Sequence, residues 1–151
     1  MKKEYYTLPL RFDQLLEKRQ HTRCQLNDSI AQHLHIMLSS HFGESRFNPD
    51  YGCSLWEFDF KMVPDPKENK FKWKESVKLS YEETIRRSEP RLSNVRVRVE
   101  IEDFIEDYKV SRKVSKKIRK RLWVQVDATI SITNQEFSFT EYLFIAPNSP
   151  D

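Results

Sequence analysis

The sequence predicts a single α+β domain in which N-terminal helices pack on one face of a mainly antiparallel sheet. Its length of 151 residues is that of one domain with a core of its own. Apolar residues recur at helical spacing in the first 90 residues, and they alternate with charged residues afterwards. Helices followed by a run of strands are typical of this layered arrangement.

The first helix is expected from Asp28, in the stretch DSIAQHLHIMLSSHFG. Its apolar residues follow the period of an amphipathic helix: Ile30, Leu34, Met37, Leu38 and Phe42. Asp28 or Asn27 can cap its start, and Gly43 can end it. The histidines of this stretch lack the i, i+4 spacing of a helical metal site, so we expect packed or surface histidines and no metal or cofactor.

A turn-rich connector follows, FNPDYGCSLWEFDFKMVPDPKENK, whose aromatic residues are expected to fold back onto the core. A second helix is predicted from Lys72 to Ser88. Its apolar residues are spaced four apart: Trp73, Val77, Tyr81 and Ile85. The Glu89-Pro90 step should end this helix, because proline disfavours helical geometry in the residue before it.

Three strands are predicted after the second helix. In the first, a buried row of Val95, Val97, Val99 and Ile101 alternates with arginine and glutamate. A second strand repeats the pattern in Leu122, Val124, Val126, Ala128, Ile130 and Ile132. Asn134-Gln135 marks a turn into a third strand with Phe137, Phe139, Leu143 and Ile145, which makes the last two strands a hairpin.

Composition excludes several classes of function. The excess of Lys and Arg over Asp and Glu is 26 − 23 = 3, too small for a general argument for nucleic acid. Two glycines cannot build a P-loop or a GxGxxG motif, and two cysteines provide neither a disulfide framework nor a CxxC zinc site. Neither a signal peptide nor a membrane span is evident, so we expect a soluble cytoplasmic protein without membrane insertion.

One segment is strongly basic. Eight of the thirteen residues of KVSRKVSKKIRKR, Lys109 to Arg121, are lysine or arginine, but no aromatic residues lie between them to stack on bases. A solvated hairpin extension or a contact with an acidic protein is therefore favoured over phosphate binding. Because Val110, Val114 and Ile118 recur every fourth residue, a short basic helix is an alternative.

Catalysis has little support in the sequence. Glu57 with Asp59, or Glu44 with Asp50, could be imagined as the carboxylate pair of a glycosidase, but proximity in sequence is weak evidence and surface acids are common. No GxSxG elbow is present, and Cys53 has no recognisable base partner.

The stretch SEPRL raises a specific question about Glu89. An acid at the C-terminal end of a helix is unfavourable by up to about 1 kcal/mol if it is exposed. With Arg91 two residues further on, the pair could be a corner presented to a partner, or it could fasten the turn from helix to strand inside the domain. Both readings remain open at this point.

The order of these segments resembles the baseplate wedge proteins of contractile phage tails, a family also labelled lysozyme-like. Within that family, the sequence is most similar to TssE of type VI secretion systems. The resemblance does not decide between a phage tail and a secretion machine. The resemblance covers residues 25–146. Residues 1–24 are expected to form an N-terminal extension, for which a helix is one option, and residues 147–151 are expected to be a frayed tail. It depends most on the PDYG step, Pro49 to Gly52, followed further on by Glu89-Pro90-Arg91.

The resemblance implies a non-enzymatic assembly protein at the baseplate of a membrane-anchored machine. The Glu-Pro-Arg loop of that family helps to attach the protein to the core bundle of the baseplate wedge, and its strands resemble the interlocking sheet of the sheath. The expected partner-binding residues are therefore Glu89, Pro90 and Arg91, and the expected structural turn is Pro49, Asp50, Tyr51 and Gly52. The expected partners are core-bundle proteins and, by strand pairing, sheath subunits. A peptidoglycan hydrolase and, less favoured, a nucleic-acid-binding module are the alternatives.

Overall fold

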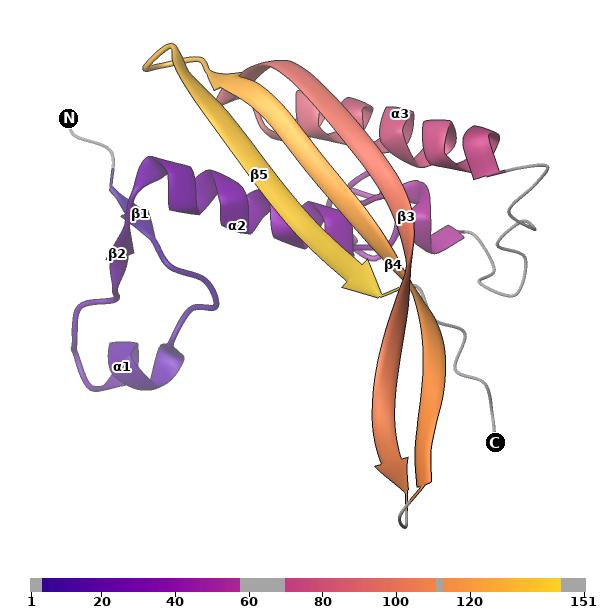
Figure 1. Cartoon of the computed structure of the whole chain (residues 1–151). Helices are drawn as coiled ribbons and strands as arrows, with labels where there is room; N and C mark the ends of the chain where they lie inside the picture. Colours follow the sequence, from indigo (N-terminus) through magenta and orange to yellow (C-terminus); the bar gives the residue numbers. More distant parts are fainter. Residues whose placement is uncertain (1–3, 58–69, 111–112, 145–151) are drawn as a thin grey trace.

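The computed structural model describes residues 4–57, 70–110 and 113–144. Its elements are β1 (Tyr5–Tyr6), α1 (Phe12–Leu16), β2 (Arg23–Cys24), α2 (Leu26–Ser39), the 3₁₀ helix η1 (Ser54–Glu57), α3 (Lys70–Ser88), β3 (Leu92–Val110), β4 (Lys113–Ile130) and β5 (Gln135–Phe144). The strands form two antiparallel sheets, a small one of β1 and β2 and a larger one in the order β3-β4-β5 (Figure 1). The predicted α+β class is confirmed.

Helix α2 begins and ends earlier than the sequence predicted. Gln25 occupies the N-cap position, and the Asp28 carboxylate accepts a hydrogen bond from the Gln25 N–H at 3.1 Å. Asp28 is therefore the third helical residue and not the cap. The helix ends at Ser39, so Phe42 and Gly43 lie in the loop that follows it. The other four residues of the predicted stripe are fully buried, as expected: Ile30, Leu34, Met37 and Leu38.

Helix α3 and the sheet enclose the core with α2. All four apolar residues predicted for α3 are buried: Trp73, Val77, Tyr81 and Ile85. The Tyr81 hydroxyl donates to the backbone oxygen of Leu34 at 2.8 Å, which ties α3 to α2 in the interior. This bond satisfies the phenol where water is excluded, and burial raises the pKa of Tyr81 well above its ordinary value.

The alternation predicted for the larger sheet is confirmed over the described residues, whereas Ile145 of the predicted third strand lies outside them. Val97 faces Val126, and Val126 in turn faces Phe139, in one apolar row across three strands. Ile132 is an exception, because β4 ends at Ile130 and Ile132 lies exposed in the turn before β5. That turn is closed by the Asn134 N–H, which donates to the Ile130 oxygen at 2.8 Å with Asn134 at a φ of 56°.

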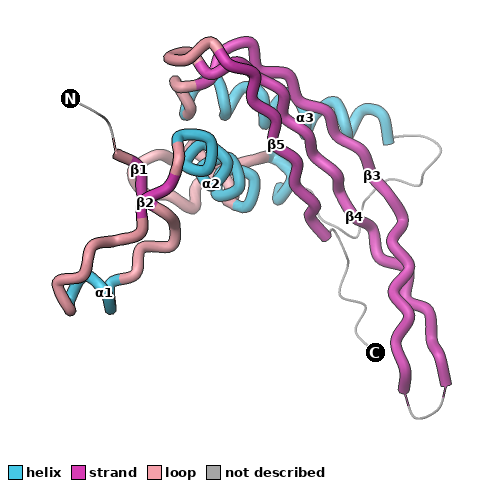
Figure 2. The backbone as a smooth tube through the Cα atoms, turned by 60° about the vertical axis from the view of Figure 1, so that its left-hand side comes forward, coloured by secondary structure: helices cyan, strands magenta, loops and turns pink. Residues whose placement is uncertain are grey.

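β3 and β4 continue as a two-stranded arm beyond the body of the sheet, as both ribbon views show (Figures 1 and 2). Their pairing runs out to Val110 and Lys113, whereas β5 extends in the described residues only to Phe144, opposite Arg121. The alternative of a short basic helix within residues 109–121 is wrong, since the described part of this segment is strand. At the start of the arm Glu102 of β3 faces Arg121 of β4, and their side chains form an ion pair at 2.7 Å, which favours this antiparallel pairing.

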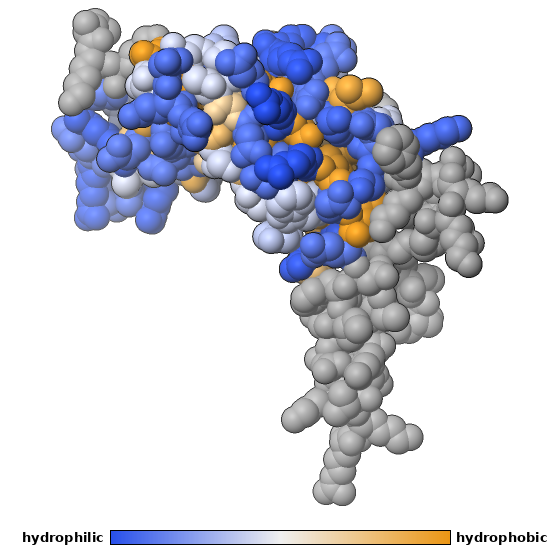
Figure 3. Space-filling view, turned by 45° about the horizontal axis from the view of Figure 1, so that its top comes forward, coloured by the Kyte–Doolittle hydropathy of each residue, from blue (hydrophilic) through white to orange (hydrophobic). Residues whose placement is uncertain are grey.

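The connector follows its prediction in part. Tyr51 and Trp56 pack against the core, whereas Phe47 is fully exposed. The rest of the predicted aromatic segment, residues 58–69, lies outside the described residues. No helix in the described ranges is long and apolar enough to cross a membrane. On the face shown in Figure 3, hydrophilic residues predominate and apolar residues emerge as a narrow band.

Candidate functional site: the corner between α3 and β3 and the open sheet edge

The corner between α3 and β3 is made by Glu89, Pro90 and Arg91. The Glu89 N–H donates to the Ile85 oxygen at 2.8 Å as the last helical bond, and Pro90 then turns the chain outward with its side chain exposed. The Leu92 N–H returns to the Glu89 oxygen at 3.1 Å, where β3 begins. The proline therefore stops the helix as predicted and fixes the two flanking residues close together.

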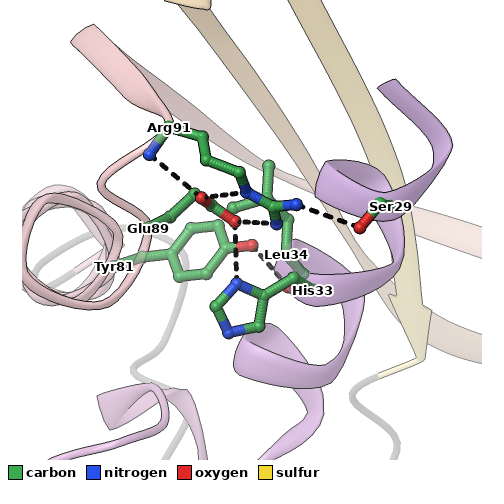
Figure 4. A network of polar contacts seen from close by, with 6 residues as sticks. All are labelled: Ser29, His33, Leu34, Tyr81, Glu89 and Arg91. Atoms are coloured by element: carbon green, nitrogen blue, oxygen red, sulfur yellow. Dashed lines mark hydrogen bonds and ion pairs between the residues drawn. The ribbon is translucent and has the colours of Figure 1, made fainter. Parts of the chain in front are cut away.

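The Glu89 carboxylate is buried, with 1% of its side chain exposed, and both of its oxygens are bonded (Figure 4). Oε1 accepts from the Arg91 Nε at 2.6 Å and from the Arg91 backbone N–H at 3.2 Å. Oε2 accepts from the Arg91 Nη2 at 2.5 Å and from the His33 Nδ1 at 2.8 Å. Four donors thus compensate the carboxylate for the hydration that it loses.

These contacts set the protonation state of Glu89. Burial raises the pKa of its carboxyl, but the hydrogen bonds from Arg91 and His33 and the positive charge of Arg91 outweigh burial and lower the pKa from 4.5 to about 2. The same pair raises the pKa of Arg91, chiefly through the hydrogen bond to Glu89. The corner therefore holds a permanent ion pair at any pH near neutrality.

Arg91 connects three parts of the chain. Its Nη1 donates to the Ser29 hydroxyl of α2 at 3.0 Å, and its guanidinium lies 5.8 Å from the ring centroid of Tyr5 in β1. The Arg91 side chain remains 23% exposed. It is therefore the part of the ion pair that a partner can reach, while Glu89 supports it from inside.

The predicted turn, Pro49 to Gly52, lies against the same site. The Tyr51 ring stacks on His33, with centroids 5.7 Å apart, and burial followed by the charge of Glu89 raises the Tyr51 pKa. Arg87, near the end of α3, donates to the backbone oxygen of Asp50. His33 thus links the two sequence motifs, which are far apart along the chain.

Gly52 is required by a close approach of two backbone segments. Its φ is +139°, and a Cβ there would lie 2.7 Å from the Ser40 oxygen and 2.8 Å from the His41 carbonyl carbon. The following Cys53 N–H donates to that same Ser40 oxygen at 3.1 Å. A side chain at Gly52 would push this turn away from the end of α2.

The sequence did not reveal His33 and Ser29 as members of the site. Both are on α2 at i, i+4 spacing, so they share one face of that helix beside the buried stripe. A search for histidine pairs overlooks such a residue because its partner is a glutamate 56 positions away. The spacing of two polar residues along the edge of an apolar stripe was the available signal.

The acid pairs considered for hydrolysis show no joint site in the described residues. Glu44 accepts the His41 N–H at 3.0 Å, and Asp50 lies 3.7 Å from the Arg87 guanidinium at an exposed position. Asp59, the proposed companion of Glu57, lies outside the described residues. No cluster of three metal-ligating side chains occurs in the ranges that the structure describes.

The second candidate surface is the outer edge of β5. The Val97 N–H of β3 bonds to the Glu82 carboxylate of α3, so Val97 turns its backbone groups away from β4. Since these groups alternate along antiparallel strands, Val126 turns toward β5, and Thr140 and Tyr142 turn outward. Among the described residues, no hydrogen bond reaches the outward backbone groups of Thr140 and Tyr142.

The described residues form a small α+β domain, with two helices on one face of a three-stranded sheet and a buried ion pair at the corner. A family model described as baseplate wedge protein gp25 matches residues 24–135, and the chain belongs to this family. The protein is thus a component of a contractile-tail baseplate.

Two further comparisons concern curated proteins and solved structures. The crystal structure of a candidate tail lysozyme from Geobacter sulfurreducens is similar, with 17% identity over 83% of this chain and 96% of that chain and a TM-score of 0.53. Identity this low shows a shared fold and carries no statement about activity. No curated protein matches the chain.

Proposed function

We propose that this baseplate protein starts assembly of the contractile sheath by strand pairing, in the manner of TssE of a type VI secretion system. The observation that carries the proposal is the outer edge of β5, where no hydrogen bond among the described residues reaches the outward backbone groups of Thr140 and Tyr142. Beyond Arg121, β3 and β4 pair only with each other among the described residues. Proteins usually protect such edges, because they template the addition of foreign strands.

The side chains of β5 suit an added strand. Toward the helices it presents Phe137, Phe139 and Leu143, of which Phe137 is buried and the other two are partly buried. An extended segment with apolar residues at alternate positions would continue this row and cover their remaining surface. We infer that the sheath subunit supplies such a segment.

Attachment to the baseplate is assigned to the other end of the domain. We infer that the exposed Pro90 and the accessible part of Arg91 contact the helical core bundle of the wedge, while Glu89 holds Arg91 in position. The protein would act in the cytoplasm, at the baseplate of a membrane-anchored machine. Its working unit would be residues 25–146, with the N-terminal extension contributing the Tyr5 contact to Arg91.

The test is to close the β5 edge without breaking the sheet. Proline at position 140 removes an N–H that faces outward, which an edge strand tolerates, so Thr140→Pro should fold and should fail to start sheaths. Thr140→Val retains the N–H and is the matched control. Sheaths are counted in cells with a fluorescent sheath subunit, in a deletion strain complemented with each variant. Normal counts with a folded Thr140→Pro protein would contradict strand pairing at β5.

Peptidoglycan hydrolysis is the second candidate, favoured by the lysozyme-like name of the similar Geobacter structure. It predicts clearing of purified cell walls in a turbidity assay, and loss of clearing in Glu57→Gln. No clearing by the folded wild-type protein would dismiss this candidate. Robust clearing that depends on Glu57 would replace the assembly function as the primary conclusion.

A further inference from the structure

We propose that Glu82 of α3 closes the edge of β3 in the body of the sheet, where three strands pair, so that a strand can add there on one side only, at β5. The inference rests on the proposed strand pairing and adds a residue that determines its direction. A three-stranded sheet has two outer edges, and nothing in the order β3-β4-β5 by itself makes them different. The difference arises from how α3 lies against β3.

Glu82 occupies the position of a neighbouring strand's carbonyl. Its Oε1 accepts the outward Val97 N–H at 2.9 Å, and the residue is 9% exposed. A carboxylate that accepts a backbone N–H in a largely buried place forms a charge-assisted bond, which is stronger than the neutral bond an added strand would offer. An incoming strand at this level would therefore exchange a better acceptor for a poorer one.

Arg86 supplies the complementary donor one helical turn later. Its Nη2 lies 3.4 Å from the Val95 oxygen and 3.4 Å from the Glu82 Oε2. The two side chains thus present an acceptor and a donor to an outward N–H and an outward oxygen of β3, which is the pattern that a paired strand presents. Arg86 is 61% exposed, so its contribution is the weaker of the two.

The core holds α3, and with it Glu82, in place. Tyr81 directly precedes Glu82, Ile85 follows it by three positions, and both are fully buried. Moving Glu82 aside would require α3 to shift as a unit or would leave a buried carboxylate without its N–H donor. Among the described residues, no side chain bonds in this way to the outward backbone groups of Thr140 and Tyr142, so a strand can add at the β5 edge.

One closed edge has a consequence for association. With only β5 open, two copies can join edge to edge and then have no further edge in the sheet body to offer, whereas two open edges permit open-ended chains. A protein that starts a polymer but does not polymerise itself needs this asymmetry. Glu82 therefore prevents open-ended self-assembly beyond a dimer and also determines where the sheath strand adds.

The test compares wild type, Glu82→Ala and Glu82→Gln by sedimentation velocity over a concentration series, with circular dichroism as the folding check. We expect wild type and Glu82→Gln, which keeps an acceptor oxygen, to stop at the dimer. Glu82→Ala should form larger species that grow with concentration, and adding Thr140→Pro should return them to dimers or smaller. Exchange of the Val97 amide should be about tenfold faster in Glu82→Ala only.

Folded Glu82→Ala protein with the size distribution of wild type would overturn the inference. If Glu82→Ala does not fold, Arg86→Ala replaces it, because this change opens part of the same edge and removes a side chain that is mostly exposed. More association of Arg86→Ala than of wild type would support the inference, and no increase would overturn it. The proposed function fails separately: if cells that lack the protein assemble normal sheaths, sheath initiation is wrong, whatever the purified variants do.

Discussion

Glu89 and Arg91 form a two-point ion pair across Pro90, with Nε to Oε1 at 2.6 Å and Nη2 to Oε2 at 2.5 Å. The acid that is unfavourable for its own helix is thus compensated by a cation two residues further on. Pro90 brings the two charges together, and His33 supplies a third side chain to the carboxylate. The fastening role considered from the sequence is present in the geometry, while the contact of this corner with a partner remains a proposal.

The ion pair should show strong coupling in a double-mutant cycle. Removing one partner leaves the other without its opposite charge, so Arg91→Ala leaves a buried carboxylate and Glu89→Ala leaves a half-satisfied guanidinium. We expect each single change to cost about 3 kcal/mol in the free energy of unfolding, and the double change to cost less than the sum by about 1 to 3 kcal/mol. Urea unfolding of the four proteins measures the coupling. Strictly additive losses would show that the pair does not act as a unit.

Stability should depend on acid pH through Glu89. The pKa of Glu89 in the folded state, about 2, is below its ordinary value of 4.5, so the folded state favours the ionised carboxylate more than the unfolded state does. This stabilisation is fully present above about pH 4.5 and is lost as the pH falls to about 2, with a difference of up to about 3 kcal/mol. Unfolding free energies at a series of pH values measure it. Glu89→Gln removes this component, so an unchanged pH profile in that variant would refute the assignment.

The apolar row of the sheet should not tolerate charge. Val97 is 2% exposed and Val126 is fully buried, so Val97→Asp or Val126→Asp would bury an unpaired carboxylate at a cost of several kcal/mol and unfold the domain. Thr140→Asp, on the opposite and exposed face of β5, is the control and should stay folded. Thermal melts decide between these outcomes, and equal melting temperatures in all three variants would contradict the assignment of faces.

The two glycines should differ sharply when replaced by alanine. Gly52→Ala meets backbone atoms at 2.7 and 2.8 Å and should cost several kcal/mol, whereas Gly43→Ala, at a φ of +77° with nothing within 4 Å, should cost about 1 kcal/mol. Denaturant midpoints measured at constant m-value give the comparison. A similar loss in both variants would indicate that backbone conformation, and not the close approach, dominates at Gly52.

Much of the fold could be predicted because each helix or strand has its own local hydrophobic periodicity. The stripes of α2 and α3 and the alternating rows of β3 and β4 are repeated many times, so errors at one position do not change the element. Element ends were less certain: Asp28 proved to be the third residue of α2 and not its cap, and Ile132 lies beyond β4. Capping depends on a few atoms, and several nearby residues can provide them.

The site was predictable only in part. The Glu89-Pro90-Arg91 corner and the turn at Gly52 stand out because proline and glycine restrict or extend backbone geometry locally. For His33 the sequence predicts only a packed or surface histidine, and it does not indicate the bond to Glu89 at 2.8 Å. The basic segment was left open between a hairpin and a helix, since its valines fit both periods.

The sequence alone determined the elements, the apolar faces and the corner at Pro90, because periodicity and proline geometry act over a few neighbouring residues. Only the tertiary structure decided that Glu89 is buried between His33 and Arg91. It also decided that Glu82 bonds to the Val97 N–H, while no described residue bonds to the outward backbone groups of Thr140 and Tyr142. These relations join residues that are far apart along the chain. They follow from how α2 and α3 lie against the sheet, and no local pattern of residues encodes that arrangement.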